Sequence, residues 1–196
     1  MYKRLKAFAV LAAFVLIGQM VVAGSANADS KESKGHCAIG LQARVADYVP
    51  GITKENTDAL VNCFNSQGEM IEFATGGRIS RTEIEHGRLA SLAELSPDFS
   101  EAGNPLLGIL YDYTNFEGSS LIFYGENGSG CYGGVTYGWR NVGPAWNDEF
   151  SSGQSFSNCG HEVYEHAGYD GARSGTATLF YSYGLLNEQV TSVVFR

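Results

Sequence analysis

Two stretches in the second half of the chain share one pattern and decide the fold. Residues 111–118 read YDYTNFEG and residues 164–171 read YEHAGYDG. Each has an aromatic residue, a second aromatic residue five positions later and a glycine two positions after that. The pattern predicts a strand that turns over in a compact hairpin, where the glycine permits a backbone angle that a side chain would resist. Internal repetition of this kind predicts a fold made of two related halves.

Each hairpin motif is followed by a second shared motif that is rich in side-chain oxygen atoms. Residues 147–152 read NDEFSS and residues 187–192 read NEQVTS. In both runs an amide and a carboxylate come first, and two hydroxyl groups close the run. Calcium prefers about six to eight oxygen ligands from carboxylates, carbonyls and neutral side chains. Neither run supplies that many, so each is predicted to need carbonyl oxygens from a neighbouring hairpin.

The rest of the second half has the composition and the spacing of apolar runs that are typical of an all-β fold. Residues 106–196 carry most of the aromatic residues, in short alternating runs separated by turn residues. Short strands at such spacing predict a β-sandwich or barrel. Asn127-Gly128 within residues 126–130 predicts a hairpin turn. The same asparagine begins a glycosylation sequon, but we favour the turn.

The two interleaved motif pairs resemble the signatures of the βγ-crystallin superfamily over about residues 106–196. The resemblance implies a mainly β fold, with two Greek keys packed as a β-sandwich. In calcium-binding members of the superfamily the two Greek keys exchange ligands, so the resemblance also implies calcium as a ligand here. It implies side-chain ligands at Asp148, Ser151, Glu188 and Thr191, backbone oxygens from Glu149 and Gln189, and hairpin donors at Asp112 and Glu165.

One position departs from the superfamily pattern. Glu188 stands where the pattern has Asp or Asn, and its extra methylene moves the carboxylate outward. Each of the two runs carries one carboxylate at its second position, Asp148 or Glu188. Low ligand charge predicts weak calcium binding, roughly micromolar to millimolar, a range that extracellular calcium fills.

The chain opens with the features of a secretory signal peptide. Three basic residues precede an apolar run over residues 7–22, and the triplet ANA at 26–28 is a small-x-small cleavage site. Cleavage there leaves 10 basic and 21 acidic residues, a net charge of −11. Nucleic acid is a poor partner for such a surface, because phosphate binding needs clustered Lys and Arg. We predict a secreted protein without a membrane anchor after cleavage.

Residues 29–105 are predicted to be a small mixed α/β or mostly α region of unknown role. A helix is expected over about residues 54–64, with Thr53 as its cap. A short strand is expected over residues 70–73. A second helix is expected from Ser80, where the sequence SRTE forms a capping box. A linker rich in Ser, Pro, Gly and acidic residues, at about 96–105, precedes the predicted domain over residues 106–196.

The four cysteines predict two disulfides, because an even number in an exported chain is typical of a disulfide framework. Three pairings are possible. We favour Cys37–Cys63 with Cys131–Cys159, because this pairing keeps each bridge within one region of the chain. A zinc site is disfavoured, since the sequence has no CxxC pair.

No catalytic arrangement is recognisable, so we predict a protein that is not an enzyme. His161 and His166 are five residues apart in a predicted strand and would point to opposite faces, which disfavours a zinc-protease site. The preferred function is a secreted calcium-binding protein whose fold calcium stabilises. The resemblance leaves two alternatives: a secreted protease (metalloproteinase) inhibitor that uses residues 133–145, with Trp139-Arg140, as its loop, and an antimicrobial toxin-like protein. The oligomeric state stays open.

Overall fold

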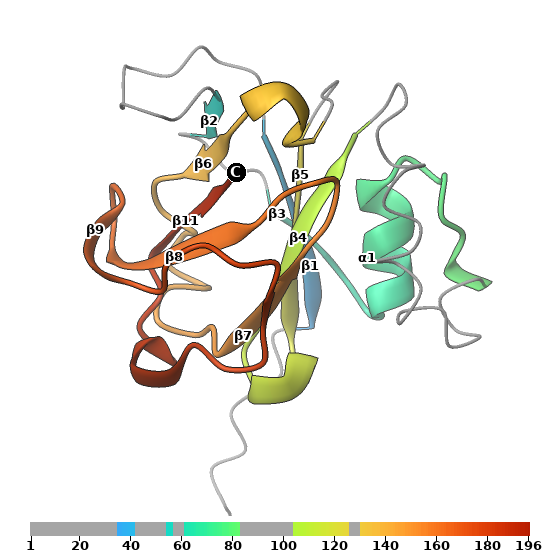
Figure 1. Ribbon diagram of the computed structural model, residues 1–196. Coiled ribbons are helices and arrows are strands. Elements are labelled where there is room, and N and C mark those ends of the chain that lie inside the picture. Colours follow the sequence, from blue (N-terminus) through green and yellow to red (C-terminus); the bar gives the residue numbers. More distant parts are fainter. Residues whose placement is uncertain (1–34, 42–53, 57–60, 83–103, 126–129) are drawn as a thin grey trace, which may run out of the picture. The chain divides into compact units, whose positions relative to one another are not determined.

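The computed structural model describes residues 35–41, 54–56, 61–82, 104–125 and 130–196, which lie in one compact unit, Ser33–Arg196 (Figure 1). The predicted signal peptide, the predicted turn at Asn127 and most of the predicted linker over 96–105 lie outside the described residues. Strands are the main regular elements of the described residues, and they form two sheets.

The second half of the chain builds two Greek keys. Its strands are β4 (Leu106–Tyr111), β5 (Ser120–Gly125), β6 (Tyr137–Trp139), β7 (Ser152–Ser155), β8 (His161–His166), β9 (Asp170–Arg173), β10 (Leu179–Phe180) and β11 (Ser192–Phe195). One sheet contains the order β10-β7-β4-β5, and the other contains β6-β11-β8-β9. Each half of the repeat therefore gives its first, second and fourth strands to one sheet and its third strand to the other. The order fourth-first-second is that of a Greek key, and the predicted sandwich is confirmed.

Strands from the first half of the chain extend both sheets. β1 (His36–Leu41) runs parallel to β5, and β3 (Val61–Phe64) pairs with β1 in the antiparallel sense. β2 (Lys54–Asn56) runs parallel to β6 in the other sheet. The sheets consequently have six and five strands. Residues on both sides of the predicted linker thus share the same two sheets.

Two secondary-structure predictions for the first half are wrong. The predicted helix over residues 54–64 is replaced by β2 and β3, because pairing with distant strands overrides the local preference. The predicted strand over residues 70–73 lies inside helix α1 (Gln67–Ala74). Ser66 caps this helix by accepting a hydrogen bond from the N–H of Glu69 at 3.2 Å.

The helix predicted after Ser80 begins where expected. Arg81 and Thr82 are helical, and the rest of the predicted segment lies outside the described residues. In the part of the chain that the structure describes, no helix has the length and apolar character needed to cross a membrane.

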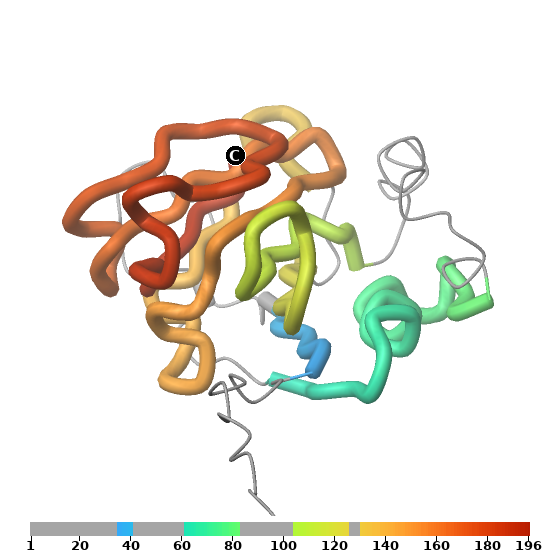
Figure 2. The backbone as a smooth tube through the Cα atoms, turned by 90° about the horizontal axis from the view of Figure 1, so that it is seen from below, coloured from blue at the N-terminus to red at the C-terminus, as the bar shows by residue number. Residues whose placement is uncertain are grey.

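Two hydrophobic clusters hold the unit together. The larger one lies between the sheets and includes the fully buried Trp139, Trp146 and Phe150. The second covers the outer face of the six-stranded sheet, where Met70 and Ile71 of α1 pack among apolar residues of β1, β4 and β5 (Figure 1, Figure 2). Burying each large side chain contributes about 1.5–3 kcal/mol, so α1 is a substantial part of the fold.

Both predicted disulfides are present. Cys37–Cys63 joins β1 to β3, and Cys131–Cys159 joins the segment before β6 to the turn before β8. The linked residues are 26 and 28 positions apart. Loops of this length are worth roughly 3–4 kcal/mol each through the unfolded state.

The packing of α1 predicts that damage to the first half of the chain destabilises the second half. We expect Ile71→Ala to lower the free energy of unfolding by roughly 2–4 kcal/mol, because Ile71 is fully buried and its truncation leaves a cavity. Fluorescence is a suitable probe in denaturant, since both tryptophans, Trp139 and Trp146, lie in the core between the sheets. Glu72→Ala, at the next and less buried position, is the control. An unchanged tryptophan transition in Ile71→Ala would contradict this coupling.

Candidate functional site

The two predicted hairpins have the same geometry. The rings of Tyr111 and Phe116 lie 5.8 Å apart, and those of Tyr164 and Tyr169 lie 5.9 Å apart. The second aromatic residue has a positive φ in both copies, 65° and 66°, and the glycine two positions later has a φ of 81° in both. Gly118 is needed for a further reason, because a side chain there would collide with the carboxylate of Asp112. The hairpin motif therefore encodes a defined backbone shape.

The last serine of each oxygen-rich run holds a hairpin in place through hydrogen bonds. The Ser152 hydroxyl accepts a hydrogen bond from the N–H of Phe116 at 3.0 Å and donates one to the carbonyl of Tyr113. Ser192 accepts from the N–H of Tyr169 at 3.1 Å and donates to the carbonyl at the matching position of the second hairpin. These two serines are committed to the fold, which leaves the preceding hydroxyl of each run for other roles.

The two oxygen-rich runs lie side by side and are joined by reciprocal hydrogen bonds. The N–H of Asp148 donates to the carbonyl of Val190 at 3.0 Å, and the N–H of Glu188 donates to the carbonyl of Phe150 at 2.9 Å. Asp148 and Glu188 both have left-handed backbones, with φ of 59° and 56°. Phe150 and Val190 are fully buried and anchor the runs. The pair of runs is thus one structural unit with a shared centre.

An open pocket brings together five of the eight predicted ligand residues. Asp148 comes from the first run, and Glu188, Gln189 and Thr191 come from the second, while Glu165 comes from the second hairpin. Asn147, His166 and Ala167 also line the pocket but were not predicted as ligands. Asn147 could have been found, because it is the first residue of the repeated run. His166 and Ala167 carry no side chain that marks them as ligands. Their place in the hairpin after Tyr164 is the signal that could have found them.

The other three predicted ligand residues do not line this pocket. Asp112, Glu149 and Ser151 occupy the matching positions around the first hairpin. The N–H of Ser151 donates to the carbonyl of Tyr111 at 2.8 Å, which places the run beside that hairpin. Asp112 is only 2% exposed and its carboxylate packs beneath Gly118. The two halves therefore share a backbone geometry but differ in the exposure of their acidic side chains.

The chemistry of the open pocket suits a hard cation. Two of its three carboxylates are already oriented, since Asp148 accepts a hydrogen bond from the side chain of Asn147 at 2.6 Å and Glu165 accepts one from the N–H of Ala172 at 3.1 Å. Within residues 130–196 and the other described ranges, the hydroxyl of Thr191 makes no hydrogen bond. Oxygen atoms of these kinds are the ones that calcium prefers.

The pocket cannot hold a metal through acidic and histidine side chains alone. Among the described residues, no group of three or more His, Cys, Asp or Glu side chains is close enough together to hold a metal ion. A cation here would also need hydroxyl and carbonyl oxygens from the runs and the hairpin. That is the ligand set the sequence predicts.

The candidate inhibitory loop is not a continuous exposed loop. Residues 137–139 form β6, which pairs with β2 and β11, and Trp139 is fully buried. Strand pairing places the ring of Trp139 in the core, so this loop does not display it to a partner. Arg140 is exposed. Inhibition of a protease, like toxin activity, stays a prediction.

His161 forms a buried hydrogen-bonded centre that the sequence did not reveal. Its Nδ1 lies 2.6 Å from the Ser155 hydroxyl oxygen, and its Nε2 lies 2.9 Å from the Tyr183 hydroxyl oxygen. Burial lowers the pKa of His161 from 6.5 to about 3. The imidazole is therefore neutral in the folded protein at physiological pH. Burial also raises the pKa of the Tyr183 hydroxyl well above 10.

Comparison with known proteins gives a likeness of fold. The structure aligns with a betagamma-crystallin from an archaeon at 21% identity (45% of this chain, 94% of that chain, TM-score 0.33). It aligns with a betagamma-crystallin domain from Clostridium beijerinckii at 20% identity (45% and 95%, TM-score 0.35) and with the N-terminal domain of Protein S at 15% identity (46% and 94%, TM-score 0.37). No protein-family model and no curated protein matches the sequence.

The exchanged third strands, the matched hairpins and the paired runs together define a βγ-crystallin-like fold in the second half of the chain. At identities of 15–21% the alignments with solved structures concern the fold alone.

The buried imidazole predicts a stability that falls in acid. The unfolded chain takes up a proton near pH 6.5, whereas folded His161 resists it until about pH 3. The free energy of unfolding should therefore fall as pH drops from 6.5 towards 3, by on the order of 2–5 kcal/mol in all. His161→Gln keeps a donor and an acceptor but does not titrate. Denaturant unfolding at several pH values should give a shallower slope for this variant between pH 6.5 and 5, and equal slopes would contradict the prediction.

The left-handed backbone at Glu188 predicts a stabilising substitution. Asn adopts this conformation more readily than Glu does, so Glu188→Asn should raise the free energy of unfolding by about 0.5–1 kcal/mol when a chelator is present. Asp148→Asn is the matched control, since Asp and Asn both tolerate the conformation, and we expect a change within about 0.5 kcal/mol. Denaturant titration measures both, and a less stable Glu188→Asn protein would refute the role given to the backbone.

Proposed function

We propose that this is a secreted, non-enzymatic calcium-binding protein in which the bound ion stabilises the fold. The observation that carries the proposal is the open pocket where Asp148, Glu188 and Thr191, from both runs, meet Glu165 of the second hairpin. These residues supply carboxylate and hydroxyl oxygens, and the hairpin can add carbonyl oxygens. In this proposal Gln189 contributes its backbone oxygen.

The segments that the pocket joins favour a role for the ion in stabilising the fold rather than in catalysis. Its walls come from three segments that are distant in sequence but adjacent in the fold. An ion held by all three would bind the folded state and not the unfolded chain, so that it stabilises the fold in proportion to its concentration. The left-handed backbones of Asp148 and Glu188 would be held by the same ion.

The first hairpin offers a second and weaker candidate site. By the symmetry of the repeat, Ser151 and Glu149 occupy there the positions that Thr191 and Gln189 have in the open pocket. The Asp112 carboxylate is buried under its own hairpin, so we assign its role to the backbone oxygen. We accordingly propose that the open pocket fills first.

Export is supported by the cysteine chemistry. Cys37–Cys63 and Cys131–Cys159 are both disulfide-bonded, and the described residues contain no free cysteine. Disulfides persist in oxidising compartments. An extracellular location would also supply the calcium that sites with few carboxylates need.

Calcium titration by calorimetry, combined with thermal unfolding, tests the proposal. At a calcium concentration of 100 times Kd, one site should add about 2.7 kcal/mol to the free energy of unfolding. For a chain of this size the melting temperature should rise by roughly 5–10 °C. Asp148→Asn removes charge without disturbing the backbone, and Thr191→Val removes the hydroxyl at nearly constant volume. Each should weaken binding at the open pocket at least about tenfold.

Asp170→Asn is the matched control for the lost charge. Asp170 is an exposed carboxylate on β9 that does not line the pocket, so calcium binding should be unchanged. A melting temperature that is the same in excess calcium and in chelator would rule out stabilisation by calcium. Binding that is equally strong in Asp148→Asn, Thr191→Val and the wild type would move the site elsewhere.

A further inference from the structure

The two disulfide bridges differ in their exposure to solvent. Cys131 is 5% exposed and Cys159 is 2% exposed, so both ends of this bridge are buried. In the other bridge Cys37 is 1% exposed, whereas Cys63 is exposed, as are the two residues before it in β3. Of the four cysteines, Cys63 is therefore the one that a molecule in solution can reach.

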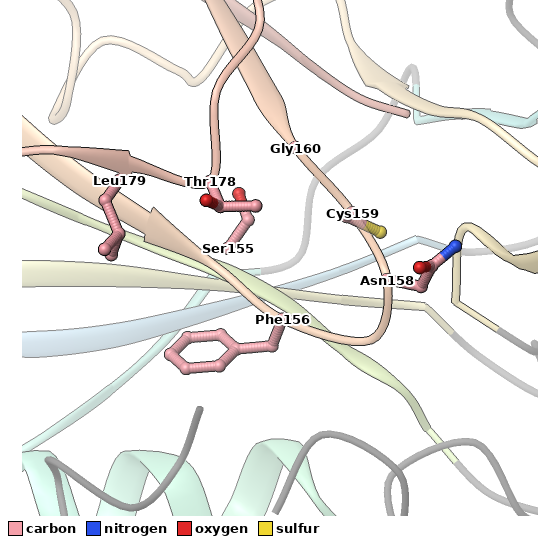
Figure 3. Close-up of a pocket in the computed structure, with 7 residues that line it drawn as sticks. All are labelled: Ser155, Phe156, Asn158, Cys159, Gly160, Thr178 and Leu179. Atoms are coloured by element: carbon pink, nitrogen blue, oxygen red, sulfur yellow. The ribbon is translucent and has the colours of Figure 1, made fainter. Parts of the chain in front are cut away.

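A pocket beside Cys159 does not change this difference. The pocket has a volume of about 350 Å³ and lies at the turn between β7 and β8, where Phe156, Asn158 and Leu179 are among its walls (Figure 3). Cys159 borders the pocket, yet it is almost completely buried. The N–H of Cys131 donates to the carbonyl of Ser157 at 3.0 Å, which holds the two segments of this bridge together. The pocket therefore does not open the Cys131–Cys159 bridge to solvent.

The strand order gives the Cys37–Cys63 bridge a direction of attack. Among the described strands, β3 is the last of the six-stranded sheet, and Cys63 lies directly opposite Cys37 of β1. Cys37 in turn lies opposite Leu121 of β5. When a thiolate attacks a disulfide, the entering and leaving sulfur atoms lie on opposite sides of the sulfur that is attacked. Attack on Cys63 therefore comes from the edge of the sheet, whereas attack on Cys37 would have to come from the side that β5 occupies.

The strand that carries Cys63 leads directly into the helix. β3 pairs with β1 alone among the described strands, and three of its four residues are exposed. Its last residue, Phe64, packs against Phe73 of α1 with the ring centroids 5.0 Å apart. Two residues separate β3 from α1 (Figure 1). Opening the bridge should therefore loosen β3 first and then the helix that follows it.

We propose that Cys37–Cys63 is a thiol-exchange site, which a small-molecule thiol opens by attack on Cys63 while Cys131–Cys159 stays closed. The thiolate forms a mixed disulfide with Cys63. The electron pair of the broken S–S bond leaves on the Cys37 sulfur, which takes up a proton from water. A second thiolate then attacks the small-molecule sulfur of the mixed disulfide and releases Cys63. In total two thiols are oxidised to one disulfide, and two cysteine thiols are formed.

The exchange makes the attachment of α1 depend on the redox state of the surroundings. In an oxidising compartment the bridge stays closed, and where small thiols are abundant it opens. Met70 and Ile71 of α1 pack on the outer face of the six-stranded sheet, so loosening β3 and α1 uncovers that face. Because neither cysteine lines the candidate calcium pocket, this proposal and the proposed function stand or fall separately.

Timed reduction of the folded protein tests the selectivity. The oxidised protein is incubated with excess glutathione, samples are quenched with N-ethylmaleimide, and mass spectrometry of the digest measures labelling at each cysteine. We expect Cys37 and Cys63 to be labelled at least about tenfold faster than Cys131 and Cys159, because access to a sulfur atom limits the rate. In concentrated guanidinium chloride the two rates should agree within about threefold, since the fold no longer shields either bridge.

Equal rates for the two bridges in the folded protein would overturn the proposal. Faster labelling of Cys131 and Cys159, or no labelling of Cys37 and Cys63, would overturn it as well. Samples quenched early with acid identify the sulfur that is attacked, because protonated thiols no longer exchange. We expect glutathione on Cys63, and glutathione mainly on Cys37 would contradict the direction of attack.

The double variant Cys37→Ala/Cys63→Ala tests the consequence for the helix. Glutathione should lower the melting temperature of the wild type by roughly 5–15 °C, and it should not change that of the variant. Hydrogen exchange in the glutathione-treated wild type should become at least about tenfold faster at the amides of β3 and α1, with β8 and β11 as the internal reference. A response to glutathione that persists in the variant, or unchanged exchange in α1 of the reduced wild type, would refute the coupling.

Discussion

The fold depends on one pair of backbone hydrogen bonds at the centre of the repeat. Asp148 and Glu188 each donate to a carbonyl in the other run, so neither run can keep its shape without its partner. The left-handed backbones at both positions cost free energy, and the burial of Phe150 and Val190 on either side offsets that cost. Because this contact joins the two halves of the repeat, it places side chains from both halves around one pocket.

The exchange of third strands also makes each half of the repeat depend on the other. β6 completes the sheet of the second Greek key and β10 completes that of the first, so that neither half closes its sheet alone. The first half of the chain breaks this symmetry. β1, β3 and α1 are added beside β5, whereas the other sheet gains β2 from the described part of the first half. The added elements bury the outer face of one sheet, which explains why residues so far apart in sequence form a single unit.

Local patterns predicted the parts of the structure that local chemistry controls. The hairpins and the two runs were found because each is set by a few residues at fixed spacing. The cysteine count predicted two disulfides and left three pairings open, and the favoured pairing is the one present. The prediction of a helix over residues 54–64 is wrong because the segment becomes strand only by pairing with β1 and β6. A short sequence window does not contain those partners. The same limit hid His161, whose partners Ser155 and Tyr183 come together only when the strands pair.

The open pocket at the paired runs gathers three carboxylates, and their charge decides what a bound ion can do. Asp148, Glu165 and Glu188 face one open pocket, where like charges repel and water screens them only in part. That repulsion lowers the stability of the paired runs unless a cation offsets it, so a cation bound there acts on the fold as a whole.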